Sequence, residues 1–223
     1  MTTTDHVVVH GEFTPVKQPR GVVLLLHMLL ANRHEYDNIA KRLATEGYAS
    51  LALDARYGDT WNGFDNETVN SMKAADRNEA GSLLDVNAAY AWLKKQYPAS
   101  PMFVLGSSIG ASLAIPFAAQ HPKLAGVLAF APDMEIFEHL NMPKAAQSLR
   151  LPVFIACNET DTEQREAKAL FEAVGSKAKT LFVLKGTSVH GARVLDPKTM
   201  VLFPELSAIY WPAVLKFLRS AGR

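Results

Sequence analysis

The 223-residue sequence has a single cysteine, almost no net charge and no long hydrophobic run. One cysteine excludes an intrachain disulfide and leaves a zinc site without its usual thiolate ligands. The 23 basic and 22 acidic residues give a net charge of +1, too little to attract nucleic acid in general. The apolar run at 22–26 is far shorter than the ~20 residues that cross a bilayer. Because no signal-peptide pattern is seen either, we expect a cytoplasmic protein without membrane insertion.

Short hydrophobic runs alternate along the chain with longer amphipathic stretches. The runs are continuously apolar, which is typical of strands covered on both faces in a parallel sheet. The predicted strands are 22–26, 49–53, 102–105, 126–130, 153–156 and 180–184. Residues 7–9 are expected to add an antiparallel edge strand.

The segments between these runs predict helices. In 79–97 the apolar residues recur on one helical face. Asn32 is the expected N-cap of a helix over 33–46, with Glu35 three residues later as in a capping box. Further helices are expected at 109–120, 162–174 and 204–220, the last of them kinked or restarted at Pro212. The alternation predicts an α/β protein, a three-layer α/β/α sandwich in one domain spanning 1–223.

A five-residue motif follows the predicted strand 102–105. Gly106-Ser107-Ser108-Ile109-Gly110 has the form G-x-S-x-G, and it stands between a strand and a helix, as this motif requires. A nucleophile on so tight a turn crowds the residues two before and two after it, so both must be small. Gly106 and Gly110 satisfy this requirement around Ser108, whereas Ser107 has the bulky Ile109 two residues after it. We therefore predict that Ser108 is a nucleophile.

With this motif the sequence resembles the α/β-hydrolase superfamily over nearly its whole length. The segments that carry the resemblance are Leu24-Leu25-Leu26-His27, Asp54-Ala55-Arg56-Tyr57-Gly58, Leu151-Pro152-Val153 with Asn158-Glu159-Thr160-Asp161, and Val189-His190-Gly191. The compact size is most similar to small esterases and dienelactone-hydrolase-like members, with serine where the latter carry cysteine. The resemblance implies the α/β-hydrolase fold with a minimal cap or none.

A serine hydroxyl needs an adjacent base that is itself oriented by a third group. Of the seven histidines, only His27 and His190 follow strands at the end of the sheet where Ser108 lies. His190 stands on a glycine-containing loop that gives it reach, so we expect it to be the general base. His27 ends its strand and is expected to brace the neighbouring loop by hydrogen bonding.

Asp161 is the expected acid of the triad. It follows the strand 153–156, and the order Ser108, Asp161, His190 is the one found in this fold. Asp133, after the strand 126–130, is the main alternative, and Glu159 and Asp196 are further candidates. Asp161 as a simple helix N-cap is the competing structural interpretation.

The oxyanion hole and the substrate pocket are expected around the loop after the first parallel strand. The backbone N–H groups of Ile109 and Leu29 are the predicted oxyanion donors, although the family's usual glycine is replaced here by Met28. Leu29 and Leu30 either pack under the following helix or line an apolar pocket. Segments 57–78 and 132–149 are expected to supply pocket or flap residues. The candidate pocket residues are Met28, Leu30, Trp61, Ile136, Phe137 and Val189.

Together these features predict a serine hydrolase that cleaves short- to medium-chain neutral carboxylic esters through an acyl-enzyme. A thioesterase, a lactonase or another acyl hydrolase would use the same triad, and a non-catalytic ligand-binding protein of the same fold is the alternative from another class. We expect no cofactor, because the phosphate-binding loop and the dinucleotide fingerprint are absent. We expect no metal either, since His6 and His10 lack a nearby carboxylate cluster. The expected partner is a small-molecule ester, and the sequence does not indicate an oligomeric state.

Overall fold

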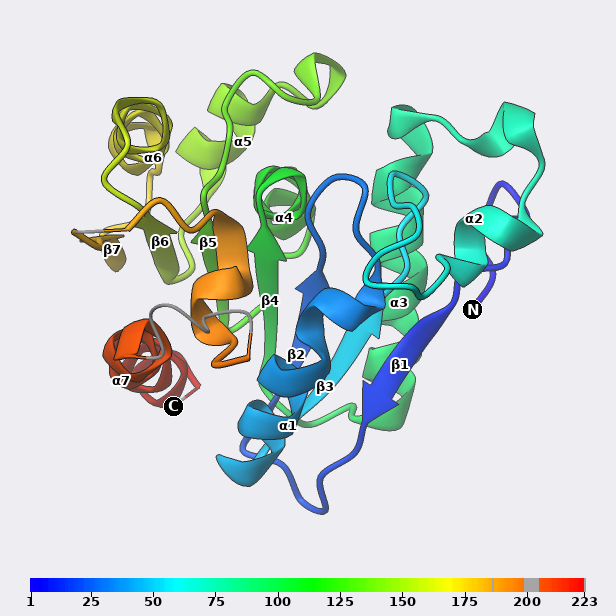
Figure 1. Cartoon of the computed structure of the whole chain (residues 1–223), viewed down its shortest axis with the longest axis horizontal. Helices are drawn as coiled ribbons and strands as arrows, with labels where there is room; N and C mark the ends of the chain where they lie inside the picture. Colours follow the sequence, from blue (N-terminus) through cyan, green and yellow to red (C-terminus); the bar gives the residue numbers. More distant parts are fainter. Residues whose placement is uncertain (186, 199–204, 223) are drawn as a thin grey trace.

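The computed structural model describes residues 1–185, 187–198 and 205–222 and contains one seven-stranded sheet (Figure 1). The strand order is β1-β3-β2-β4-β5-β6-β7, and each neighbouring pair is parallel except β1 with β3. The strands are β1 Gly11–Thr14, β2 Gly21–Leu26, β3 Tyr48–Leu53, β4 Met102–Ser107, β5 Gly126–Phe130, β6 Val153–Cys157 and β7 Lys179–Val183. The six predicted parallel strands are thereby confirmed within two residues at their ends.

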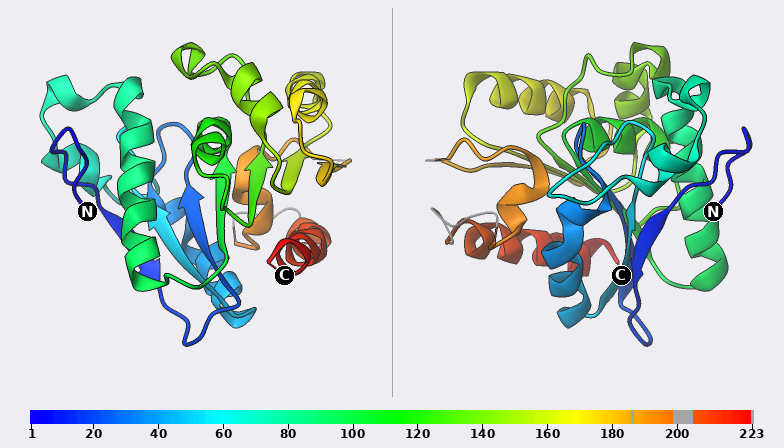
Figure 2. Two further views of the ribbon diagram at one scale, coloured as in Figure 1. Left: turned by 180° about the vertical axis from the view of Figure 1, so that it is seen from behind. Right: turned by 45° about the vertical axis from the view of Figure 1, so that its right-hand side comes forward.

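Helices cover both faces of this sheet (Figure 2). The α-helices are α1 Asp37–Thr45, α2 Glu67–Ser71, α3 Ser82–Gln96, α4 Ile109–Gln120, α5 Met142–Ser148, α6 Asp161–Ala173 and α7 Glu205–Ala221. The 3-10 helices are η1 Arg33–Tyr36, η2 Ala74–Asp76, η3 Glu79–Gly81, η4 Glu138–Leu140 and η5 Gly191–Leu195. No helix among the described residues is both long and apolar enough to span a membrane.

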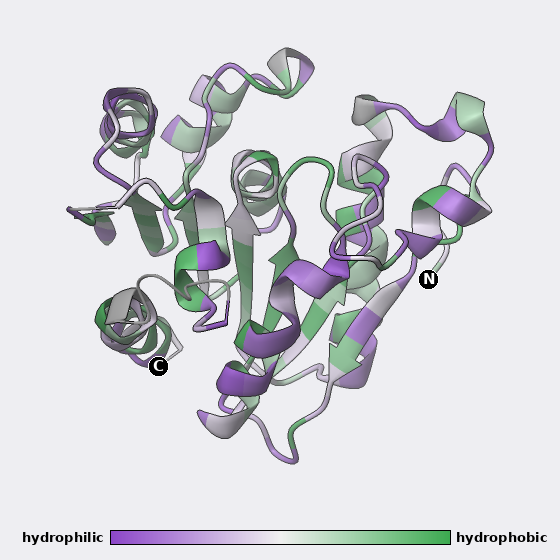
Figure 3. Cartoon of the chain, in the orientation of Figure 1, coloured by the Kyte–Doolittle hydropathy of each residue, from purple (hydrophilic) through white to green (hydrophobic). Residues whose placement is uncertain are grey.

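Alternate residues of the buried strands belong to two different hydrophobic clusters. In β2, Leu24 packs in the cluster with α3, α4, α5 and α6, whereas Val23 and Leu25 pack in the cluster with α1, η5 and α7. Figure 3 shows the hydrophobic colour concentrated on the strands between these two layers. Successive side chains of a strand point to opposite faces, so a strand buried on both faces must be apolar throughout. The predicted three-layer α/β/α sandwich is confirmed.

Several local expectations differ from the structure. The antiparallel edge strand is β1, not residues 7–9, of which Val8 forms only an isolated bridge with Thr2. Val7 and Val9 are buried side chains that anchor the N-terminal segment to the core. The polar segment 57–78, expected to supply pocket or flap residues, contains α2 and η2. Helix α7 continues through Pro212, so it is not restarted there.

The segment predicted as one helix over 33–46 consists of η1 followed by α1. Asn32 is the N-cap as expected, and its side chain accepts a hydrogen bond from the N–H of His34. The predicted capping box is wrong, because the Glu35 carboxylate accepts a hydrogen bond from the N–H of Met28. This different use of Glu35 brings η1 against the loop that follows β2.

Candidate active site

Ser108 stands in a strained turn between β4 and α4. Its backbone lies at φ 53° and ψ −118°, a left-handed conformation that costs a residue with a side chain about 1–3 kcal/mol. A Cβ added to Gly106 would lie 2.2 Å from the Gly110 oxygen, and one added to Gly110 would lie 2.3 Å from the Leu26 oxygen. Both glycines are therefore required sterically, as the sequence motif indicates. The turn leaves Ser108 partly exposed at the carboxyl end of the sheet.

His190 lies at the same end of the sheet, directly before η5. Its Nδ1 is 2.6 Å from Oε1 of Glu163, and its side chain is 44% exposed. The next residue, Gly191, has φ +68°, and a Cβ there would lie 2.3 Å from the Ser107 Oγ. Glycine at 191 thus allows the chain after His190 to pass directly over Ser107. The Ser107 Oγ accepts a hydrogen bond from the Ala192 N–H at 2.9 Å, which fixes the start of η5 to the end of β4.

Glu163 is held in place by Asn158. The Asn158 backbone N–H donates to Oε2 of Glu163 at 3.1 Å, and its side-chain amide donates to Oε1 at 2.8 Å. The same amide also donates to the carbonyl of Val189, the residue before the histidine, at 3.3 Å. Asn158 is 2% exposed. It therefore links the carboxylate and the histidine loop from a buried position.

The structure differs here from the expectation that Asp161 is the acid beside His190. Asp161 is the first residue of α6 with an exposed side chain, and the N-cap is Thr160. Two residues correspond to about 200° around a helix, so Asp161 and Glu163 cannot both face the imidazole. Glu163 faces it, and its additional methylene extends its reach.

The other carboxylates that the sequence suggested lie elsewhere. Asp133 is tied to α4 because its N–H and carbonyl both bond to the Ser112 hydroxyl. Asp196 ends η5 and accepts hydrogen bonds from Asn38 of α1. Glu159 is exposed at the start of the loop before α6. Sequence reasoning missed both Glu163 and Asn158, although each lies in the segment after β6 that was predicted to carry the acid.

The loop after β2 contributes one candidate oxyanion donor, the backbone N–H group of Leu29, at this end of the sheet. His27 is fully buried; its Nδ1 lies 2.7 Å from the Met28 carbonyl, and its Nε2 accepts from the Ala55 N–H at 3.0 Å. Burial lowers the pKa of His27 to about 4, so the ring is neutral and supports the loop. The Met28 N–H is committed to Glu35. Among the described residues, the N–H groups of Leu29 and Ile109 have no hydrogen-bond partner, as a pair of oxyanion donors requires.

Glu35 places a second carboxyl group, after that of Glu163, close to the elbow. It is 4% exposed, and its Oε2 accepts from the Met28 N–H at 2.7 Å. Burial raises the pKa of Glu35 to about 7, although Ser107, Met28, Arg193 and His190 offset part of this rise. The carboxyl of Glu35 therefore changes its charge near neutral pH behind the candidate nucleophile.

The predicted pocket residues fall into two groups. Leu29 and Leu30 are 50% and 55% exposed, so they do not pack under the following helix. Trp61 lies within reach of the histidine loop, since the guanidinium of Arg193 is 5.8 Å from its ring centroid. Met28 and Val189 are half-buried. In contrast, Phe137 is buried in the core and Ile136 packs against the same cluster.

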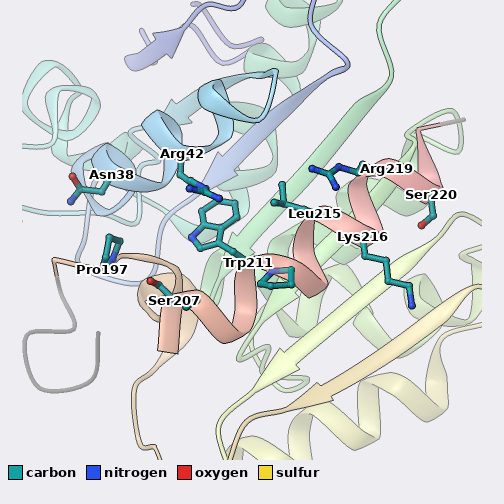
Figure 4. Close-up of a pocket in the computed structure, with 11 residues that line it drawn as sticks. Asn38, Arg42, Pro197, Ser207, Trp211, Leu215, Lys216, Arg219 and Ser220 are labelled. Carbon is teal, nitrogen blue, oxygen red and sulfur yellow. The ribbon is translucent and has the colours of Figure 1, made fainter. Parts of the chain in front are cut away.

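A large cavity lies away from these residues. It has a volume of about 870 Å³ between α1 and α7, and Figure 4 shows Trp211, Leu215 and Arg219 of α7 along it. None of the predicted site residues lines it. Cys157 is unsuited to act as a nucleophile, because burial at the end of β6 raises the pKa of its thiol to about 11 and keeps it protonated.

Comparisons with known proteins identify the family and the fold. The family model described as "Serine aminopeptidase, S33" matches residues 17–150, more than half of the chain. A monoacylglycerol lipase of Mycolicibacterium smegmatis is 27% identical over 115 residues, which are 52% of this chain and 38% of that protein. The chain thus spans well under half the length of this curated relative.

Solved structures share the fold over nearly the whole chain. An esterase of Pyrococcus furiosus has a TM-score of 0.74 at 22% identity, covering 100% of this chain and 89% of its own. A dienelactone hydrolase of Anabaena variabilis has a TM-score of 0.74 at 17% identity, covering 96% and 93%. A monoacylglycerol lipase of Paleococcus ferrophilus has a TM-score of 0.67 at 17% identity, covering 95% and 99%. At these identities the likeness shows the fold alone, which is that of the α/β-hydrolases.

Proposed function

Because the chain belongs to the S33 serine aminopeptidase family of α/β-hydrolases, we propose that it is a serine hydrolase that cleaves esters. The observation that carries the proposal is the 2.6 Å contact of the His190 Nδ1 with Glu163, in a loop fixed against the strained Ser108 elbow. A carboxylate at Nδ1 keeps the proton on that nitrogen and leaves Nε2 as the base. Ser108, His190 and Glu163 are the proposed triad.

The reaction follows from these roles. Nε2 of His190 takes the Ser108 hydroxyl proton while Oγ attacks the ester carbonyl, and Glu163 stabilises the imidazolium that forms. The Leu29 and Ile109 N–H groups bind the oxyanion of the tetrahedral intermediate. The imidazolium then protonates the departing alcohol. The alcohol dissociates, and the acyl group stays bound to Ser108 as the acyl-enzyme. Water attacks the acyl-enzyme by the same sequence and releases the acid, with the proton returned to Ser108.

The surroundings of Ser108 favour a neutral, partly apolar substrate of modest size. Leu29 and Leu30 are exposed beside the elbow, and Trp61 is half-buried on the segment facing the histidine loop. Apolar walls with few polar groups are typical of small-ligand sites. The segment 132–149 folds into η4 and α5, and α5 packs on α4. The segment therefore contributes little to a lid over Ser108. We therefore propose short- to medium-chain neutral carboxylic esters as substrates.

Covalent labelling tests the proposed function. A fluorophosphonate should add once to the purified chain, as read by intact mass, and labelling should disappear in Ser108→Ala and fall strongly in His190→Ala. Ser112→Ala is the matched control, because Ser112 is a buried serine of α4 whose hydroxyl bonds only to backbone groups of Ser108 and Asp133. A panel of esters and thioesters of increasing acyl length then identifies the preferred bond. A parent chain that takes up no probe, or labelling that survives in Ser108→Ala, would contradict the proposal.

A further inference from the structure

A second group of chemically active side chains lies on the outer surface of η1 and α1. One ligand atom each from Glu12, His34 and Asp37 lies within 4.8 Å of the other two. The three residues also line one small surface pocket of about 170 Å³. They belong to three different elements, since Glu12 is on β1, His34 is on η1 and Asp37 begins α1. Figure 1 shows the edge strand β1 in blue on the rim of the sheet.

The pairing of β1 with β3 explains why Glu12 faces this pocket. Glu12 stands opposite Ala52 in the antiparallel register, and Ala52 packs in the hydrophobic cluster under α1. Opposed residues of neighbouring strands share a face of the sheet, so the Glu12 side chain projects toward α1. The Glu12 carboxylate has no hydrogen bond or ion pair with any described residue. It is thus an unpaired anion directed at the other two groups.

The remaining two groups are already at the spacing of metal ligands. The His34 Nδ1 lies 3.1 and 3.2 Å from the two Asp37 oxygens, and the His34 side chain is only 13% exposed. Its ring stacks on Phe64 at 4.1 Å between centroids, which fixes its orientation. In a tetrahedral zinc site with bonds of ~2.0–2.1 Å, neighbouring ligand atoms are about 3.3 Å apart. Glu12 needs to approach by roughly 1.5 Å, a shift that an exposed glutamate makes by changing rotamer.

The described part of the chain contains two comparable histidine–carboxylate pairs that lack a third ligand. His10 lies 3.2 Å from Glu67, and His190 lies 2.6 Å from Glu163. Among the residues that the structure describes, only the His34–Asp37 pair belongs to a group of three possible ligands. The cations that line the same pocket are Arg33, which is bound to Asp54 and Glu67, and Lys41, which is exposed.

We propose that Glu12, His34 and Asp37 bind a zinc-like divalent cation that fastens the edge strand β1 to the start of α1. One imidazole and two carboxylates form a donor set that suits zinc and its neighbours better than calcium or magnesium, which prefer oxygen alone. A fourth position remains for water. This site is separate from the proposed triad, and its role is structural. Because η1 also carries Glu35, the cation additionally holds the segment that supports the Met28 loop.

Zinc titration of the EDTA-treated protein tests the site. Calorimetry should find one tight Zn²⁺ per chain, and Zn²⁺ should raise the Tm. Glu12→Gln and His34→Asn should each lower the affinity for Zn²⁺ by about 10–100-fold or more. Loss of a group that only supports a ligand already costs this much. Both variants should also remove the shift in Tm. His10→Asn is the matched control, because it removes a half-buried histidine of a two-residue pair and should leave affinity unchanged.

The outcomes separate this site from others. A titration of His190→Asn shows whether the ion instead occupies the candidate active site, and loss of binding there would overturn the proposal. Absence of Zn²⁺ binding by the parent protein would overturn it as well. Unchanged Zn²⁺ affinity in Glu12→Gln would also overturn the proposal. It would show that the ion is bound by His34 and Asp37 alone, which form an ordinary surface pair. Since the readouts are binding and Tm, their failure leaves the proposed hydrolase function unaffected.

Discussion

At the scale of single residues, the orientation of the His190 ring depends on the carboxylate of Glu163. Its oxygen lies 2.6 Å from Nδ1, whereas Asp161 is exposed at the start of α6. We expect Glu163→Gln to lower kcat/KM by roughly 10²–10⁴, because an amide can stabilise the wrong tautomer and cannot stabilise the imidazolium. Asp161→Asn is the matched control and should stay within about twofold of the parent. The measurement is hydrolysis of a p-nitrophenyl ester, and the reverse ranking of the two variants would restore Asp161 as the acid.

The same residues show how far a sequence can define this site. The sequence leaves one candidate for the nucleophile, Ser108, because of the steric demand around it. Position after a strand leaves two histidines, of which the glycine-containing loop favours His190, and both roles stay predictions. The acid was not predictable, because Asp161 and Glu163 occur in the first turn of one helix and only the rotation of that helix decides which faces the ring. Asn158 and Glu35 were missed for a related reason. Their roles are hydrogen bonds to Glu163 and to the Met28 N–H, and neither contact has a sequence pattern of its own.

At the level of elements, two buried serines of the β4–α4 unit form hydrogen bonds to two different segments, the start of η5 and the loop after β5. Ser107 accepts a hydrogen bond from the Ala192 N–H, and Ser112 bonds to both backbone groups of Asp133. We expect Ser107→Ala to leave the Ala192 N–H unpaired, at a cost of about 1–3 kcal/mol in the free energy of unfolding. Hydrogen exchange should then show lost protection at Ala192, with the protection at Asp133 retained.

Ser112→Ala provides the reciprocal control for this prediction. It should release the Asp133 N–H and leave the Ala192 amide protected. If either variant lowers the hydrogen-exchange protection of Ala192 and Asp133 equally, the two serines do not hold their segments independently. Fluorophosphonate labelling that persists in Ser107→Ala would also distinguish its structural role from that of Ser108.

The elements themselves were predictable to different degrees. The six parallel strands are continuous apolar runs because both of their faces are buried, so composition alone identifies them. The edge strand β1 is half polar and has one covered face, and the more apolar residues 7–9 compete with it in the sequence. In the segment 57–78, α2 has five residues, too few for a recognisable period. Its helical state depends on the Asn66 cap, whose side chain accepts from the Val69 N–H.

For the whole molecule, two buried groups near the elbow give opposite contributions to the pH dependence of stability. The pKa of Glu35 rises from its ordinary value of 4.5 to about 7, so the folded state holds a proton that the unfolded state has lost between these values. The pKa of His27 falls from 6.5 to about 4, so there the unfolded state holds the additional proton. Stability rises with pH wherever the unfolded state binds more protons. Between pH 4.5 and 6.5 the two effects oppose one another and nearly cancel.

Replacing Glu35 should isolate its own contribution to the pH dependence, because the His27 contribution is common to the variant and the parent. In Glu35→Gln the side-chain oxygen still accepts from the Met28 N–H, but the cost of ionising a buried carboxyl is gone. The free energy of unfolding of the variant minus that of the parent should therefore increase by about 3 kcal/mol between pH 4.5 and pH 7.5, at about 1.4 kcal/mol per pKa unit. Urea denaturation across this range measures it. Glu172→Gln removes the same charge from an exposed position of α6 and should give a constant difference. If the difference in the free energy of unfolding between Glu35→Gln and the parent is also constant with pH, Glu35 ionises normally. In that case the packing of η1 against the Met28 loop, which buries Glu35, is wrong.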